Sequence, residues 1–197
     1  MSGKGSRLEG GALTGEVIDS SRKVIAGGRN GAGVGLQQYF TPPEAGQLLS
    51  YLFDKNHPTL DLAAGDGGLL EWVVKKSRYG IEIDRDQVRD GNYPDHAIGG
   101  DIQKVYPLLR GVGATWPQLV VNPPFGLEWS VPGINDKKKG SSTLRSFQMM
   151  TRLLHHFGQA AFICGRDRYE KEISRLPEAK QVWAKIEVDD FFEGVEL

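Results

Sequence analysis

The chain has 197 residues, which is enough for one good-sized hydrophobic core and little more. A hydrophobic content of 39% and a net charge of −1 favour a folded domain and exclude a strong overall field that would attract nucleic acid. The single cysteine, Cys164, excludes an internal disulfide framework and a multi-cysteine zinc site. No apolar run approaches the roughly 18–20 residues that cross a bilayer, so we expect a cytoplasmic protein with no membrane association.

The first predicted element follows a glycine-rich segment, residues 1–36, that we expect to be flexible because glycine raises the cost of ordering. Residues 37–197 are expected to form one domain. Its first helix is predicted from about Thr41 to Phe53, because Thr41 and Glu44 have capping-box spacing and Pro42 suits the first helical position.

Short apolar runs then alternate with segments of helical periodicity. Such alternation predicts an α/β fold with a mostly parallel, doubly wound sheet and helices on both faces. A polar loop is expected over 126–142. Gly158 is expected to end the helix predicted over 144–157. A last strand is expected within 186–197. The expected strands are 59–63, 79–83, 96–98, 118–121 and 159–164, and the expected helices are 69–73, a short one after Asp84, 102–109 and 144–157.

A glycine turn, Asp61 to Gly68, joins the first strand to the next helix. Its glycines let the backbone approach a ligand closely at the carboxyl end of the strand, and Glu82, at the end of the next strand, is placed to hold a ribose diol. A plain turn beside an incidental acid is the alternative. Leu70 stands where a dinucleotide fingerprint needs its last glycine, which disfavours NAD. Asp61 would repel a pyrophosphate but attract an ammonium group, which S-adenosylmethionine carries.

This stretch resembles motif I of class I S-adenosylmethionine-dependent methyltransferases. The resemblance implies a Rossmann-like fold and that cofactor. Two positions depart from the family pattern: Leu62 replaces a frequent proline, and Asp66 replaces a hydroxyl residue. Asp66 places a second carboxylate beside the expected cofactor.

A strand also ends on Asn122, Pro123, Pro124 and Phe125, which resembles the catalytic motif of amino-methyltransferases, especially DNA adenine-N6 methyltransferases. An adenine amino group is a weak nucleophile because its lone pair is delocalised into the ring. Acceptors on the Asn122 side chain and on a backbone carbonyl, expected to be that of Pro123, would pull it toward a tetrahedral geometry, and proline rigidity would hold them still. Phe125 would stack on an extruded base. An ordinary proline-rich turn is the alternative.

The order of the motifs resembles the gamma group of adenine-N6 methyltransferases, which includes modification subunits of restriction systems. In that group an N-terminal motif like Tyr39-Phe40-Thr41 holds the methionine part of the cofactor, and an aspartate after the third strand, here Asp101, binds its adenine. The resemblance implies cofactor contacts from Tyr39, Phe40, Thr41, Asp61, Ala63, Gly65, Gly67, Glu82, Ile83, Asp101, Ile102 and Asn122.

Basic residues follow the catalytic motif: Lys137, Lys138, Lys139 and Arg145. A solvated charged surface is one interpretation. The other is a loop that closes on nucleic acid with lysines on the phosphates, with Trp129 either near the extruded base or anchoring the loop. No spacing of His155 and His156 indicates a metal site.

The expected function is therefore methylation of the adenine N6 amino group in DNA, with S-adenosylmethionine as cofactor. RNA adenine or a protein glutamine side chain is an alternative acceptor, and a catalytically silent, cofactor-binding scaffold subunit is a further alternative. The family usually continues with a β-hairpin and a target-recognition domain, and neither is evident here. We therefore expect base specificity to come from a partner protein or from a missing region.

Overall fold

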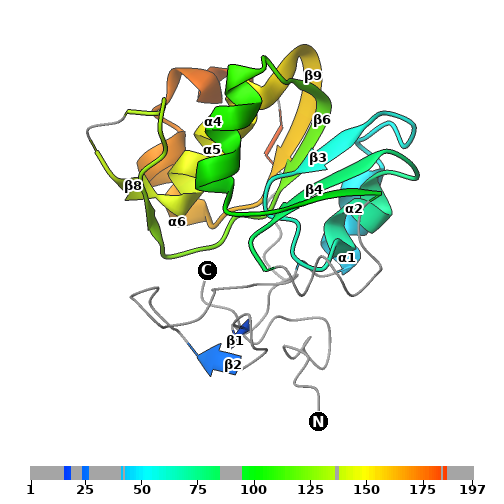
Figure 1. Cartoon of the computed structure of the whole chain (residues 1–197), viewed down its shortest axis with the longest axis horizontal. Helices are drawn as coiled ribbons and strands as arrows, with labels where there is room; N and C mark the ends of the chain where they lie inside the picture. The colour runs from blue at the N-terminus through cyan, green and yellow to red at the C-terminus, as the bar shows by residue number, and fades with distance from the viewer. Residues whose placement is uncertain are drawn as a thin grey trace.

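The computed structural model describes residues 41, 43–84, 95–135, 138–182 and 184–185, and the backbone of 16–18 and 24–26. Five parallel strands form the central sheet, in the order β5-β4-β3-β6-β9 (Figure 1). This confirms the predicted α/β fold with its mostly parallel, Rossmann-like sheet. The strands are β3 (Thr59–Asp61), β4 (Arg78–Glu82), β5 (His96–Gly99), β6 (Trp116–Val121) and β9 (Leu154–Phe162).

Helices cover both faces of the sheet, as predicted (Figure 1). Leu70 and Val73 of α2 pack with Val120 in one apolar cluster, whereas Tyr106 of α4 and Leu153 of α5 pack with the other face. No helix within the described part of the chain has the length and apolar character of a membrane span. The longer helices of the described part of the chain are α1 (Pro43–Ser50), α2 (Gly68–Val73), α4 (Ile102–Gly111) and α5 (Ser142–Leu153).

The remaining elements are short. Within the segment expected to be flexible, β1 (Glu16–Ile18) and β2 (Val24–Ala26) pair antiparallel, which the sequence analysis did not predict. The expected helix after Asp84 and the expected strand within 186–197 lie outside the described residues. After β9 come α6 (Arg166–Arg168), the π-helical η1 (Tyr169–Ile173) and the 3₁₀-helical η2 (Pro177–Gln181).

The boundary between α5 and β9 differs from the prediction. We expected one helix through Phe157, but the backbone turns extended at Leu154 (φ −70°, ψ 133°), and Leu154 pairs with Trp116 of β6. Gly158 lies within β9 and closes no helix; a Cβ there would lie 2.8 Å from the Pro117 carbonyl oxygen. The helical spacing continued past the true end because β9 follows α5 with no intervening loop.

The segment expected to be a polar loop contains two short strands. β7 (Glu128–Trp129) pairs antiparallel with β8 (Gly140–Ser141), and Trp129 is buried in the core at 7% exposure. Val131 and Ile134 are buried beside it. The apolar side chains of this segment therefore anchor it to the domain, because leaving them exposed would forfeit their hydrophobic stabilisation.

Candidate active site

The order of the strands in the sheet reverses between β3 and β6. β4 and β5 lie on one side of this pair and β9 lies on the other, so the chain leaves the two central strands in opposite directions. Open α/β sheets bind ligands at such a reversal point, outside the carboxyl ends of the strands. Asp61 ends β3, Glu82 ends β4 and Asn122 directly follows β6, so three predicted site residues lie at this edge.

The glycine turn has a backbone geometry that suits glycine. Gly65 and Gly67 adopt positive φ angles of 55° and 77°, which glycine tolerates and other residues rarely adopt. The N–H of Gly67 donates to the Ala64 carbonyl at 2.8 Å, and the N–H of Gly65 donates to Oε2 of Glu82 at 2.8 Å. Glu82 therefore braces the turn in addition to the ribose contact expected of it.

Asp61 is a carboxyl group placed where its charge is disfavoured. It is 1% exposed. Burial first, and the nearby carboxylates of Glu82 and Asp66 in addition, raise its pKa to about 7, although the hydrogen bond from the Ala63 N–H at 2.9 Å acts to lower it. A cationic group beside Asp61 would relieve both the desolvation and the repulsion. This environment fits a ligand that carries an ammonium group, as S-adenosylmethionine does.

The loop after β5 brings Asp101 to the same edge. The N–H of Gly100 donates to the Glu82 carbonyl at 2.7 Å, which ties the ends of β4 and β5 together. Asp101 caps α4, and its Oδ1 accepts from the Gln103 N–H at 2.9 Å. Ile102 is 6% exposed and packs into the core, whereas Ile83 is 46% exposed, so Ile83 offers the larger apolar surface to a ring.

The Asn-Pro-Pro-Phe motif begins where β6 ends. Nδ2 of Asn122 donates to Oγ1 of Thr41 at 2.9 Å, across 81 positions of sequence. This contact joins the N-terminal motif to the Asn-Pro-Pro-Phe motif, whereas the sequence shows only the order in which they follow one another. Pro123 is buried, and Pro124 and Phe125 are half-buried. Of the other N-terminal candidates, Tyr39 and Phe40 lie outside the described residues.

Ser142 is a further residue of this site that its sequence context did not indicate. Its hydroxyl donates to the Pro124 carbonyl and its N–H donates to the Leu127 carbonyl at 2.8 Å. Ser142 falls within the polar loop that the sequence predicts, although Ser141 in front of it caps α5 and is a residue type typical of helix starts. That cap was the signal that could have moved the predicted helix start to Ser142.

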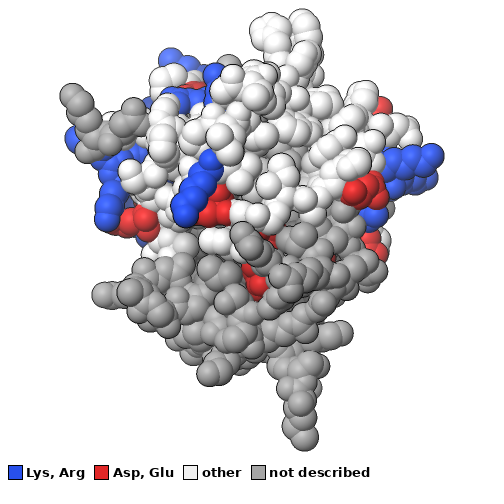
Figure 2. Space-filling model, in the orientation of Figure 1, with Lys and Arg blue, Asp and Glu red and all other residues white. Residues whose placement is uncertain are grey.

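The basic candidates divide into two kinds. Lys138 and Lys139 are exposed, and Lys137 lies outside the described residues. Arg145, by contrast, is 2% exposed, and its guanidinium donates to Oε1 of Gln148 at 2.9 Å and to the Lys138 carbonyl. An inward guanidinium cannot reach a phosphate, so our assignment of Arg145 to nucleic-acid binding is corrected: it braces the segment that carries the lysines. On the face in Figure 2, basic and acidic residues lie beside one another in several small groups.

The structure gives little support for catalysis by a cysteine nucleophile or for a metal site. Burial raises the pKa of the Cys164 thiol to about 11, so it is protonated at neutral pH and is a poor nucleophile. Among the described residues, no three His, Cys, Asp or Glu side chains gather in a way that could hold a metal ion. His155 and His156, which we expected on a helix, are exposed on β9.

Comparison with known proteins finds likeness in structure only. No protein-family model matches the chain, and no curated protein matches it in sequence. A protein from Listeria monocytogenes assigned as a class I S-adenosylmethionine-dependent methyltransferase superposes with a TM-score of 0.54 at 13% identity, over 76% of this chain and 52% of that one. One from Streptococcus mutans assigned as an S-adenosylmethionine-dependent methyltransferase gives 0.50 at 10% identity, over 75% and 42%.

A protein from Vibrio vulnificus assigned as the modification subunit of a type I restriction enzyme gives a TM-score of 0.47 at 22% identity, over 64% of this chain and 34% of that one. This chain thus spans about half of the Listeria protein and about a third of the Vibrio subunit. The likeness to the Listeria protein concerns the fold, because identity is low. The chain therefore has the Rossmann-like fold of class I S-adenosylmethionine-dependent methyltransferases.

Proposed function

We propose that the chain binds S-adenosylmethionine and methylates the N6 amino group of adenine in DNA. One observation carries the proposal: the Asn-Pro-Pro-Phe motif follows β6 at the reversal point of the sheet, next to the β3 strand that ends in Asp61. An acceptor-activating motif beside a buried carboxylate suits transfer from a cationic cofactor to a planar amino nitrogen. Base specificity is proposed to come from a partner protein or a target-recognition region.

The cofactor would be held by residues of three neighbouring strand ends. Asp61 supplies a counter-charge for its ammonium group, Glu82 accepts from its ribose, and Asp101 accepts from its adenine amino group. When bound, S-adenosylmethionine supplies an electrophilic methyl group on a sulfonium sulfur. The glycine turn contributes close backbone approach, since Gly65 and Gly67 present no side chain there.

The acceptor would be activated by the motif itself. Oδ1 of Asn122 and the carbonyl oxygen of Pro123 accept the two amino N–H groups, which draws the nitrogen lone pair out of conjugation. Thr41 supports this role because it accepts from Nδ2 and so directs Oδ1 away from itself. Phe125 stacks on the base face, and Lys138 and Lys139, with Lys137, contact phosphates.

The test is methyl transfer from labelled S-adenosylmethionine to separated DNA, RNA and protein acceptors. We expect label at adenine N6 in DNA, and we expect Asn122→Ala to lower transfer at least about 100-fold, as loss of a preorganised oxyanion-hole donor does in other enzymes. Asn56→Ala is the matched control, because Asn56 lies in the exposed turn before β3, away from the site.

Each other outcome has a definite meaning. Label on RNA or on protein glutamine, but not on DNA, would reject the proposed acceptor. Transfer that survives Asn122→Ala would reject the proposed activation. Cofactor binding with no transfer to any acceptor would favour the silent scaffold subunit.

A further inference from the structure

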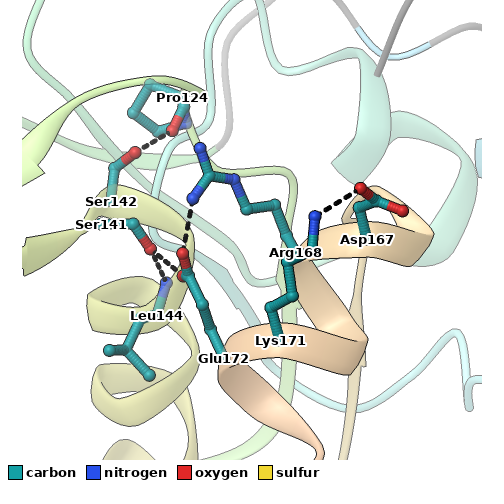
Figure 3. A network of polar contacts seen from close by, with 8 residues as sticks. All are labelled: Pro124, Ser141, Ser142, Leu144, Asp167, Arg168, Lys171 and Glu172. Carbon is teal, nitrogen blue, oxygen red and sulfur yellow. Dashed lines mark hydrogen bonds and ion pairs between the residues drawn. The ribbon is translucent and has the colours of Figure 1, made fainter.

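We propose that Ser142 is a positioning residue that fixes the turn carrying Phe125, an inference that rests on the proposed function. The turn runs from Pro124 to Leu127. Ser142 is 0% exposed; its hydroxyl donates to the Pro124 carbonyl (Figure 3) and its N–H donates to the Leu127 carbonyl at 2.8 Å. One residue of α5 therefore binds both ends of the turn that follows the catalytic asparagine.

The turn needs such an external donor. Pro123 and Pro124 have no N–H, so the motif has few donors of its own for nearby carbonyl groups. Gly126 adopts a φ angle of 75°, which reverses the chain within the turn. Phe125 lies between the two bound carbonyls, so the direction of its ring depends on both contacts.

A second set of contacts holds Ser142 in place. Ser141, its neighbour, caps α5 by accepting from the Leu144 N–H at 3.1 Å, and the Ser141 hydroxyl donates to Oε2 of Glu172 (Figure 3). Oε1 of Glu172 pairs with the Arg168 guanidinium. The first turn of α5 is thus fixed from η1, and the two hydrogen bonds of Ser142 transmit that position to the motif.

Removing the Ser142 hydroxyl should misplace the adenine that accepts the methyl group without weakening cofactor binding. In Ser142→Ala the Pro124 carbonyl loses its bond from Ser142, and the turn is released at one end. Displacement of about 1 Å can cost on the order of 100-fold in rate, so we expect kcat to fall about 10- to 100-fold. Ser142 contacts none of the proposed cofactor residues through these bonds, so the Kd for S-adenosylmethionine should change less than about twofold.

The experiment compares Ser142→Ala with Ser146→Ala, since Ser146 is a second buried serine, 2% exposed, on the same helix. Calorimetry gives the cofactor Kd, steady-state kinetics give kcat, and hydrogen exchange gives the protection of residues 122–128. We expect faster exchange in 122–128 and a lower kcat for Ser142→Ala alone. Equal exchange and equal kcat in the two variants would overturn the inference.

The inference stays testable if the wild-type chain is inactive or if the Ser142→Ala variant does not fold. If the wild-type chain methylates no acceptor, the proposed function fails, while the exchange comparison still decides whether Ser142 holds the turn. If Ser142→Ala does not fold, Ser142→Cys keeps the size of the side chain with a weaker donor. That variant must then show the same selective loosening of 122–128, and its absence would reject the positioning role.

Discussion

At the scale of single residues, the carboxyl group of Asp61 shows how the fold sets the chemistry of the site. Its side chain comes from a strand that is buried on both faces, so its ionisation is opposed by burial first and by neighbouring carboxylates second. The same burial strengthens any attraction to a cation, because little water screens it. In the free protein the charged form of Asp61 is therefore destabilised, and a cation beside it would stabilise that form.

Asp61 should make the stability of the free protein depend on pH. Its pKa is raised from 3.8 to about 7, so the folded chain binds this proton more tightly than the unfolded chain. The resulting stabilisation is fully present below about pH 4 and is lost as pH rises through 7, by up to about 4 kcal/mol. Urea unfolding of wild type and Asp61→Asn at pH 5 and 8 should show a smaller pH effect in the variant. Equal pH effects would contradict the assignment.

Thr41 should act on the rate through Asn122. Thr41→Val removes the acceptor for Nδ2 while keeping the shape, so the amide can rotate and the proposed acceptor oxygen is no longer fixed. We expect kcat for methyl transfer to fall about tenfold in Thr41→Val. This assumes that losing one hydrogen bond, worth about 1 kcal/mol or more, raises the activation free energy by the same amount. Thr41→Ser should restore kcat. A raised cofactor Kd with unchanged kcat would assign Thr41 to cofactor binding only.

At the scale of elements, close helix packing on one face of the sheet supports the glycine turn. α1 and α2 lie together, and α2 begins where the glycine turn ends (Figure 1). A Cβ on Gly46 of α1 would lie 2.6 Å from Cδ1 and 3.0 Å from Cβ of Trp72 in α2. Because Trp72 Cβ is fixed to the helix backbone, the close approach of the two helices depends on this glycine.

Gly46→Ala should therefore destabilise the domain although alanine is the better helix former. Overpacking of this kind costs about 1–3 kcal/mol, more than the gain in helix propensity of about 1 kcal/mol. Gly111→Ala in α4 is the control, because a Cβ there meets nothing within 4 Å. Thermal unfolding should show a lower Tm for Gly46→Ala and an equal or higher Tm for Gly111→Ala. The reverse order would show that α1 and α2 are not packed as described.

At the scale of the whole molecule, net charge limits how the chain can hold DNA. The net charge is −1, and the correction of Arg145 leaves Lys137, Lys138 and Lys139 as the proposed phosphate contacts. Electrostatic binding should then be weak, and its dependence on salt should be shallow. Any tight, sequence-specific binding would need positive charge from another protein or region.

The salt dependence of DNA binding tests this directly. Three phosphate contacts predict a slope of about −3 for the logarithm of affinity against the logarithm of salt concentration. Replacing Lys138 and Lys139 by glutamine should reduce the slope by about 2, whereas glutamine at Lys75 and Lys76, exposed residues beyond α2, should not. Fluorescence anisotropy with a short duplex measures both. An unchanged slope in the first variant would place the phosphate contacts elsewhere.

The sequence by itself determined the fold class and the approximate bounds of the five strands of the sheet. Apolar runs of strand length, separated by helical periodicity, have few arrangements other than a parallel sheet with helices on both faces. It also placed Asp61, Glu82 and Asn122 at strand ends, because a strand that is buried must stop where polar groups begin. Two of its errors fell at the junction of α5 and β9, where no loop separates helix from strand, and in the segment before α5, where β7 and β8 are too short to show a periodicity.

Only the tertiary structure decided how those residues act together. The hydrogen bond between Thr41 and Asn122 spans 81 positions, and the Ser142 contacts cross from α5 to the motif, so neither follows from local spacing. The exposure of a side chain also depends on long-range packing. The sequence therefore suggested that Arg145 could contact a phosphate, whereas the folded chain buries it. Residue type sets which chemistry is possible, whereas packing between distant segments sets which atoms meet and which charges are desolvated.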